Sequence, residues 1–240
     1  MDLNRRNFLK GAAVASVVAA GSLAVGCTPA EEEPAEKWEY DVDVAVAGFG
    51  AGGAMAALTA QKGGASVVCV EAYHQVGGTA MDSAGGATGP GSMEVAQANM
   101  PYSKPEFLQT FVDCIGEATN VMEEYDAFIR PGAGGVGFTI GAESTHKARV
   151  ECYEDLAEKF VDGGGVLLME TKAFKLLTNE DGSIVGLMAR KSDGTEIKIK
   201  AKAVILACGG FQNNPELKTK FFGPMGDQVF CRAVPTNDGT

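Results

Sequence analysis

The residues with the clearest chemical meaning form a glycine run near position 50, Gly48-Phe-Gly50-Ala-Gly52-Gly53, which fits the pattern G-x-G-x-x-G. In this pattern Gly48 allows a tight turn, Gly50 lets the backbone approach a pyrophosphate, and Gly53 permits close packing of the following helix. Glu71 follows about 20 residues later, where a carboxylate can accept hydrogen bonds from ribose hydroxyls. Together, these two features predict a dinucleotide-binding site and not a purely structural turn.

The segments around these residues have the periodicity of a strand-helix-strand unit. Residues 41–47 form a β-branched run that ends at Gly48, residues 51–61 are alanine-rich with helical spacing, and residues 66–71 form a second apolar strand. The unit spans about 30 residues, which is the length that a βαβ unit needs. The N-terminus of its helix would present free N–H groups and the positive end of the helix dipole to the phosphates.

Downstream, the sequence predicts two helices and an antiparallel meander. Apolar residues recur at helical spacing over residues 104–129 and 145–161, on either side of a glycine-rich loop. Further strands are expected at residues 166–169, 174–177, 184–190 and 196–200, the last three divided by Asp-Gly pairs. A separate apolar strand at 203–207 then returns to the main sheet. The expected fold class is α/β, Rossmann-like, with a parallel sheet, helices and an inserted antiparallel β-meander.

Further glycine motifs give the chain a resemblance to a known family. They are Gly77-Gly78-Thr79-Ala80, Ser83-Ala-Gly85-Gly86, and AVILACGGF at residues 203–211 followed by two asparagines. With the first glycine run, they resemble the flavoproteins of the fumarate reductase and 3-ketosteroid dehydrogenase family. The similarity covers most of residues 40–240. This resemblance implies FAD as the cofactor.

The dinucleotide motif and the resemblance together imply which residues contact FAD, mostly through backbone that small side chains leave accessible. These residues are Gly48, Gly50, Gly52, Gly53, Glu71, Gly78, Thr79, Ala80, Gly85, Gly86, Ala173, Ala207, Gly209 and Gly210. Three positions depart from the family pattern. Thr79 replaces an Asn and can still form hydrogen bonds through its hydroxyl. Ala72 replaces a common Lys and so removes one charge near the adenosine, and Cys208 replaces a Thr.

The resemblance implies reduction of an activated carbon–carbon double bond in an unsaturated acid or ketone, with hydride passing from reduced FAD. The six cysteines contain no C-x-x-C pair, so no haem or cluster motif is present and a separate donor, quinol-linked or a cytochrome, is expected. Cys69 and Cys208 are interpreted as small buried hydrophobic residues. The alternatives are a dehydrogenase of the same family and a truncated, non-catalytic FAD-binding remnant.

No catalytic residue and no metal ligand are assigned. The family's substrate-binding arginines and histidines lie in a capping domain and a C-terminal segment, so the chain is expected to be truncated before the capping domain. His74 and His146 stand outside the family's catalytic motifs and are interpreted as surface or loop residues. Arg130, Arg149 and Arg232 are interpreted as structural or solvated.

The N-terminus resembles a twin-arginine export signal. Residues 5–10 read RRNFLK, and the apolar stretch at residues 11–26 is too short and too rich in Ala and Gly to span a bilayer well. Asn4 stands where Ser or Thr is usual. The resemblance implies export by the twin-arginine translocase to the periplasm or the outer face of the cytoplasmic membrane. Cys27 is a candidate for lipid attachment, and an ordinary cleavage site nearby is the alternative.

Composition sets the remaining limits. The expected organisation is a signal at residues 1–27, an acidic linker at 28–39 and an incomplete FAD-binding domain at 40–240. The hydrophobic content of 45% supports one globular core. A net charge of −11 argues against nucleic acid as a partner.

Overall fold

A computed structural model describes residues 37–83, 86–124, 128–132, 135–139 and 145–239. The predicted signal and the predicted site residue Gly85 lie outside these ranges. Lys37–Thr240 forms one compact unit. Glu39, which we placed in the linker, accepts a hydrogen bond on its carboxylate from the Lys198 N–H (2.7 Å). Among the described residues, no helix has the length and apolar character needed to cross a bilayer.

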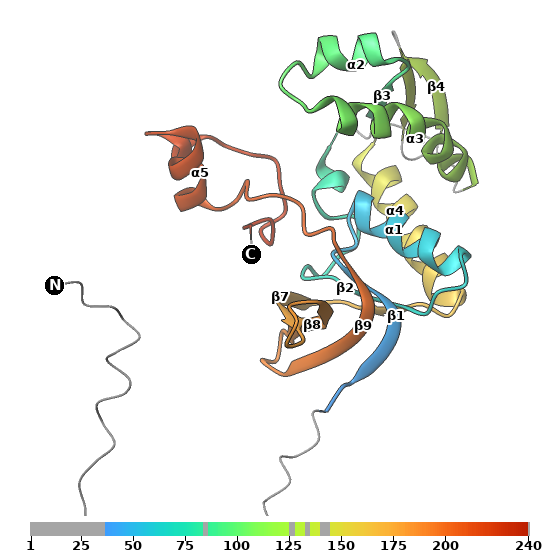
Figure 1. Ribbon diagram of the computed structural model, residues 1–240. Helices are drawn as coiled ribbons and strands as arrows, with labels where there is room; N and C mark the ends of the chain where they lie inside the picture. The colour runs from blue at the N-terminus through green and yellow to red at the C-terminus, as the bar shows by residue number, and fades with distance from the viewer. Residues whose placement is uncertain (1–36, 84–85, 125–127, 133–134, 140–144, 240) are drawn as a thin grey trace, which may run out of the picture. The chain divides into compact units, whose positions relative to one another are not determined.

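This unit contains a six-stranded sheet with the order β6-β2-β1-β9-β8-β7, most of whose strands are labelled in Figure 1. Its strands are β1 (Tyr40–Ala47), β2 (Val67–Val70), β6 (Val166–Leu168), β7 (Thr171–Thr178), β8 (Ile184–Lys191) and β9 (Glu196–Leu206). β1 pairs in parallel with both β2 and β9, and β2 pairs in parallel with β6. β7, β8 and β9 pair antiparallel. The predicted Rossmann-like α/β class with an antiparallel meander is confirmed.

β9 is one uninterrupted strand where the sequence predicted two, at 196–200 and 203–207, so that prediction was wrong. Its first part pairs with β8, where Leu187 lies opposite Ile199. Its later part pairs with β1, and Leu206 lies opposite Ala47. The change from alternating polar and apolar residues to a continuous apolar run therefore marks a change of neighbouring strand and not a break in the chain.

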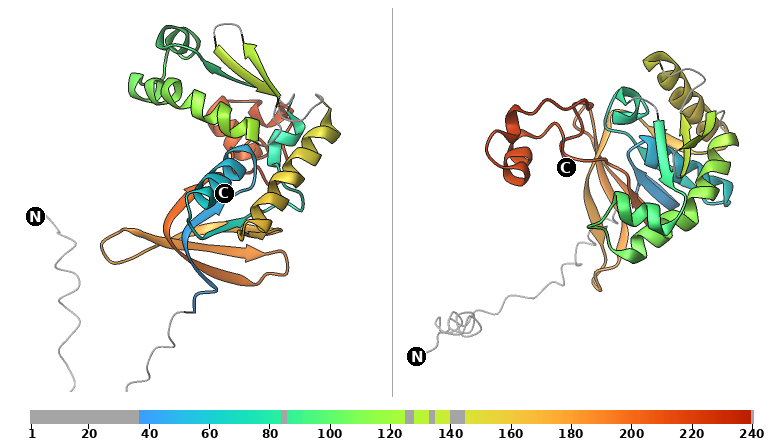
Figure 2. Two further views of the ribbon diagram at one scale, coloured as in Figure 1. Left: turned by 90° about the vertical axis from the view of Figure 1, so that its right-hand side faces the viewer. Right: turned by 90° about the horizontal axis from the view of Figure 1, so that it is seen from above.

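Helices cover one face of β1 and β2, and the antiparallel meander covers the other (Figure 2). Helices α1 (Ala51–Lys62) and α4 (His146–Asp162) cover one face. The side chains buried there include Val46, Phe49, Leu58, Cys69, Tyr153, Leu156 and Phe160. On the other face, Ala45, Ala47, Val68 and Val70 pack with Leu187, Ala189, Ile197 and Ile199 of the meander. Because both faces are covered there, residues 44–47 of β1 and all four residues of β2 form continuous apolar runs, whereas the first half of β1 contains Asp41 and Asp43.

A second, three-stranded sheet was not predicted. It consists of β3 (Gly86–Pro90), β5 (Gly135–Thr139) and β4 (Phe128–Gly132) in that order, next to α2 (Met93–Asn99) and α3 (Pro105–Glu124). The predicted helix over 104–129 was wrong at its C-terminal end, because Ile129 lies in β4. Glycine-rich strands have weak intrinsic β-propensity, and their pairing partners decide the structure.

The remaining elements are short. Two 3-10 helices are η2 (Gly78–Asp82), which follows β2, and η3 (Gly226–Gln228), near the C-terminus. Between β9 and η3 lies α5 (Pro215–Phe222), which begins where the Asn214 side chain accepts a hydrogen bond from the Leu217 N–H (3.0 Å). This side-chain bond satisfies one of the N–H groups that a helix N-terminus leaves without a partner.

Phe160 provides a test of the core between α4 and the sheet. Its side chain is fully buried, and its ring centroid lies 5.8 Å from that of Phe49. We expect Phe160→Ala to lower the free energy of unfolding by about 3–5 kcal/mol, because the cavity it leaves is closed by packed neighbours. Chemical denaturation followed by circular dichroism measures this change.

The matched control is Val161→Ala, at the next position of α4, where the side chain is 49% exposed. We expect this control to change the free energy of unfolding by less than about 0.5 kcal/mol. Equal effects of the two substitutions would contradict the packing described here.

Candidate cofactor-binding site

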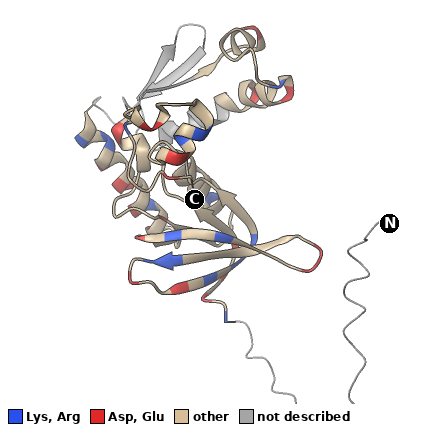
Figure 3. Cartoon of the chain, turned by 90° about the vertical axis from the view of Figure 1, so that its left-hand side faces the viewer, with Lys and Arg blue, Asp and Glu red and all other residues tan. Residues whose placement is uncertain are grey.

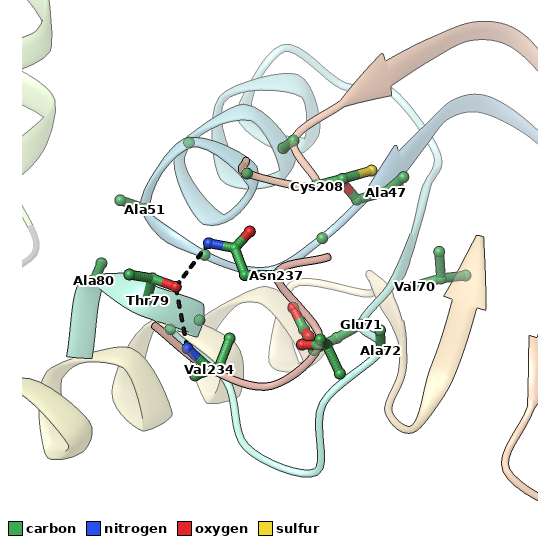
Figure 4. Close-up of a pocket in the computed structure, with 18 of the residues that line it drawn as sticks. Ala47, Ala51, Val70, Glu71, Ala72, Thr79, Ala80, Cys208, Val234 and Asn237 are labelled. Carbon is green, nitrogen blue, oxygen red and sulfur yellow. Dashed lines mark hydrogen bonds between the residues drawn. The ribbon is translucent and has the colours of Figure 1, made fainter. Parts of the chain in front are cut away.

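A pocket of about 240 Å³ lies at the carboxyl ends of the parallel strands (Figure 4). Its walls come from the β1–α1 loop, the residues after β2, η2, β7, the end of β9 and the chain near residues 234–237. Open α/β sheets bind their ligands at this edge. The pocket therefore occupies the place that the glycine motif predicts.

Close backbone contacts place the N-terminus of α1 at this pocket. Gly48 has a φ of +100°, and a Cβ atom there would lie 2.5 Å from the carbonyl oxygen of Ala207. A Cβ atom on Gly53 would lie 1.8 Å from the carbonyl oxygen of Gly48. A Cβ atom on Gly52 would meet no atom within 4 Å, and Gly52 lines the pocket. Two glycines thus permit close packing, and the third faces open space.

The first turn of α1 is suited to bind an anion. The N-cap residue, Gly50, makes no side-chain cap, and the first turn contains no acidic residue. Ala51 and Gly52 of this turn line the pocket. The first N–H groups of an α-helix have no partner within the helix, and the helix dipole adds partial positive charge at the same end. This geometry fits a phosphate group.

Glu71 follows β2 and is buried, although it also lines the pocket. Its Oε2 accepts a hydrogen bond from the Phe49 N–H (2.7 Å), and its Oε1 accepts one from the Tyr73 N–H (2.8 Å). The carboxylate thereby ties the β1–α1 loop to the end of β2. Each carboxylate oxygen can accept a second hydrogen bond, so Glu71 keeps capacity for ribose hydroxyls.

Asn237 joins several walls of the pocket. Its Nδ2 donates to Thr79 Oγ1 (3.0 Å) and to Gln212 Oε1 (2.9 Å), and its Oδ1 accepts from the Gly210 N–H (2.9 Å). Thr79 Oγ1 also accepts from the Val234 N–H (3.3 Å), as Figure 4 shows. Because protein donors occupy the Thr79 oxygen, its hydroxyl proton remains available for a ligand.

Helix α4 packs against η2. Arg149 is buried, and its Nε donates to the carbonyl oxygen of Met81 (2.8 Å), which gives this arginine the structural role we predicted as one of two possibilities. Gly77 has a φ of +96°, and a Cβ atom there would lie 2.7 Å from the Tyr153 ring. Burial raises the pKa of the Tyr153 hydroxyl, so this side chain is neutral at physiological pH.

Two cysteines flank the end of β1. Cys69 is buried as predicted, and its Sγ donates to the Gly48 carbonyl oxygen (3.5 Å). Cys208 is exposed and lines the pocket, which corrects our interpretation of it as a buried residue. Its Sγ donates to the Ala47 carbonyl oxygen (3.6 Å). Desolvation is the largest cause that raises the pKa of both thiols.

The pocket brings together most of the predicted site residues. Those that line it are Gly48, Gly50, Gly52, Glu71, Gly78, Thr79, Ala80, Ala173, Ala207 and Gly209. Gly53 packs against the Gly48 carbonyl, the Gly210 N–H donates to Asn237 Oδ1, and Gly86 begins β3, so these three do not line the pocket. Their contacts with a cofactor remain predictions. Within the described part of the chain, no group of three or more His, Cys, Asp and Glu residues is placed to hold a metal ion.

Sequence reasoning missed several residues that line the pocket, including Lys172, Val234, Thr236 and Asn237. Lys172 directly precedes Ala173, a predicted FAD contact, and this adjacency could have indicated that Lys172 lines the pocket. No role was assigned from the sequence to Val234, Thr236 or Asn237. Their positions depend on long-range contacts.

Comparison with known proteins gives two family matches. A model of the FAD binding domain matches residues 43–240, and a model of the twin-arginine translocation pathway signal matches residues 2–26. The chain is 29% identical over 214 residues to the urocanate reductase of Eggerthella lenta, which covers 79% of this chain and 35% of that protein. The chain thus spans about a third of the length of this curated relative.

Solved structures share the fold. The open conformation of a flavocytochrome c3 fumarate reductase matches with a TM-score of 0.72 and 23% identity, over 84% of this chain and 39% of that chain. A 3-ketosteroid-Δ4-(5α)-dehydrogenase from Rhodococcus jostii RHA1 matches with a TM-score of 0.70 and 20% identity, over 85% of this chain and 53% of that chain. At these identities the likeness concerns the fold.

Substitutions of the two neighbouring glycines separate packing from ligand binding. We expect Gly53→Ala to lower the free energy of unfolding by about 1–3 kcal/mol, because its methyl group would overlap the Gly48 carbonyl and shift α1. We expect Gly52→Ala to leave stability within about 1 kcal/mol of wild type, since its methyl group meets no protein atom.

In a flavin titration, Gly52→Ala should nevertheless weaken FAD binding, because Gly52 lines the pocket and the methyl group would take up open space beside its backbone. Wild-type affinity in this variant would show that the cofactor does not occupy the space beside Gly52.

Proposed function

We propose that this chain is the flavin-binding part of an exported reductase of activated carbon–carbon double bonds. The chain belongs to the FAD-binding domain family, whose model matches residues 43–240. FAD is the cofactor of this family. The observation that carries the proposal is the pocket in which the uncapped N-terminus of α1 and the buried carboxylate of Glu71 meet at the ends of parallel strands.

The residues of the pocket fit the adenosine diphosphate half of FAD. The N–H groups of the first turn of α1 would hold the pyrophosphate, beside the open space that Gly52 leaves. The second acceptor positions of the Glu71 oxygens would take the ribose hydroxyls. The hydroxyl proton of Thr79 and the backbone of Ala80 are further contacts on η2. We assign the same role to the other predicted site residues that line the pocket.

Bound FAD supplies hydride transfer to or from a substrate carbon, which no side chain of the pocket performs. The contribution of this chain is to bind and orient the cofactor. Among the described residues that line the pocket there is no histidine and no arginine, so we assign no proton donor there. The reductase direction is supported by the name of the relative with 29% identity, a urocanate reductase.

We propose an unsaturated acid or ketone as the substrate and a separate electron donor, either a quinol-linked protein or a cytochrome. A dehydrogenase that acts in the reverse direction, and a binding module without activity, use the same pocket. These three functions differ in what the FAD-loaded protein turns over.

The test is to load the purified protein with FAD, remove free flavin and record the absorption spectrum, which should show a stoichiometric flavin band. Reduced viologen is then offered with fumarate, urocanate, crotonate or cinnamate in turn. For this chain joined to the capping domain and C-terminal segment that the resemblance implies, we expect viologen oxidation that depends on one of these acids. FAD binding followed by oxidation of a saturated substrate would identify a dehydrogenase, and binding without either reaction would identify a binding module and contradict the reductase proposal.

The match to a twin-arginine signal over residues 2–26 supports export across the membrane. We propose that the twin-arginine translocase carries the protein and that Cys27 receives the lipid anchor. Replacing both Arg5 and Arg6 with Lys should retain the protein in the cytoplasm, because the translocase recognises the arginine pair. Cell fractionation and immunoblotting measure the distribution.

The matched control is Asn4→Ser, which introduces the more usual residue before the pair and should export normally. Export of the double Lys variant at the wild-type level would contradict the assignment. Cys27→Ser should move the exported protein from the membrane to the soluble fraction, and an unchanged distribution would contradict lipid anchoring.

A further inference from the structure

Among the described residues that line the pocket, the charged side chains are those of Lys172 and Glu71. The Glu71 carboxylate already accepts hydrogen bonds from two backbone N–H groups. Lys172 lies on β7 and forms an ion pair with Asp238, with 2.7 Å between Nζ and Oδ2. The Lys172 side chain is 38% exposed, so its ammonium group lies at the rim of the pocket and not in the core.

Lys172 lines the same pocket as Ala72, a residue that departs from the family pattern. Ala72 removes a lysine charge that is common near the adenosine, and Ala72 and Lys172 both line the pocket. A neighbouring cavity of about 260 Å³ is also lined by Ala72 and Lys172, so the two cavities meet at these residues. The small side chain of Ala72 leaves room there, and the Lys172 ammonium supplies a positive charge at the junction.

Other basic residues occur on the strands of the meander (Figure 3), but within the described part of the chain none of them lines the pocket. Arg190, which lines the neighbouring cavity, pairs with Glu196 (2.7 Å) and lies over the Phe174 ring at 4.6 Å from its centroid. Lys200 pairs with Asp41 at 2.9 Å. Lys172 is therefore the basic residue best placed to act on a ligand in the pocket.

Both charges of the pocket act on the opposite wall. Desolvation raises the pKa of the Cys208 thiol most, the Glu71 carboxylate raises it further, and the Lys172 ammonium group lowers it by a smaller amount. Cys208 precedes Gly209 at the end of β9, on the wall across from β7. A diphosphate in the space between these walls would lie within the field of the ammonium group.

We propose that Lys172 is a cofactor-binding residue whose ammonium group stabilises the negatively charged adenosine diphosphate half of FAD and takes the place of the family lysine that Ala72 lacks. This inference rests on the proposed function. A protein with a net charge of −11 and a carboxylate in the same pocket needs positive charge to bind a dianion. The dipole of α1 supplies only about half an elementary charge at its N-terminus. Asp238 holds the ammonium group at the rim until the phosphates are present.

The test is to titrate the full-length apoprotein with FAD at several salt concentrations. We expect Lys172→Met to weaken FAD binding about tenfold, the usual size of the loss of a hydrogen bond to a charged group. We also expect the variant to lose part of the salt dependence of wild type, because a screened charge contact is gone. Lys172→Arg should restore most of the affinity. Circular dichroism checks that each variant is folded.

Two further variants serve as controls. Lys175→Met removes an exposed lysine from the same strand and should leave FAD affinity at the wild-type level. Asp238→Asn releases Lys172 from its ion pair and should keep or raise FAD affinity. If Lys172→Met and Asp238→Asn weaken binding equally, the pair acts only as a tether and the proposal is wrong.

Wild-type affinity in Lys172→Met, or a loss with unchanged salt dependence, would also overturn it. Absence of FAD binding by the wild-type protein would instead contradict the proposed function.

Discussion

The close approach of helix α1 to the ends of the parallel strands is the contact on which the pocket depends. A helix can direct its N–H groups at a ligand only if its first turn reaches the sheet edge, and the Gly48 carbonyl occupies the place where a Cβ atom of residue 53 would lie. Any larger residue at position 53 would push α1 outward and move the anion-binding turn away from the strands. Gly48 itself lies against Ala207 at the end of β9.

Phe49, the variable residue between the first two glycines, connects this pocket to the core. Its N–H donates to the Glu71 carboxylate (2.7 Å), and its carbonyl oxygen accepts a hydrogen bond from the Gly77 N–H (2.8 Å). Its ring packs on Phe160 of α4. One residue thus fixes the β1–α1 loop relative to β2, η2 and the helix layer. Stability and ligand binding therefore depend on the same short segment.

The segment near residues 234–238 closes one wall of the pocket through contacts of unequal strength. Asn237 is buried, and its amide makes three hydrogen bonds, so losing it would leave buried polar groups without partners. The ion pair of Lys172 and Asp238 is partly solvated, with side chains 38% and 33% exposed, and such pairs contribute little to stability. The amide holds the wall in place, whereas the lysine remains able to respond to a ligand.

The sequence by itself determined the βαβ unit, the glycine motif and Glu71, because strand and helix periods, positive φ and phosphate binding at a helix N-terminus are local properties. It also indicated the meander, because turn residues mark its hairpins. Only the tertiary structure decided that β9 is continuous, that glycine-rich strands form a second sheet, and that Lys172 and Asn237 belong to the pocket. The physical reason is that these features depend on pairing and hydrogen bonds between residues far apart in the chain, which local patterns do not specify.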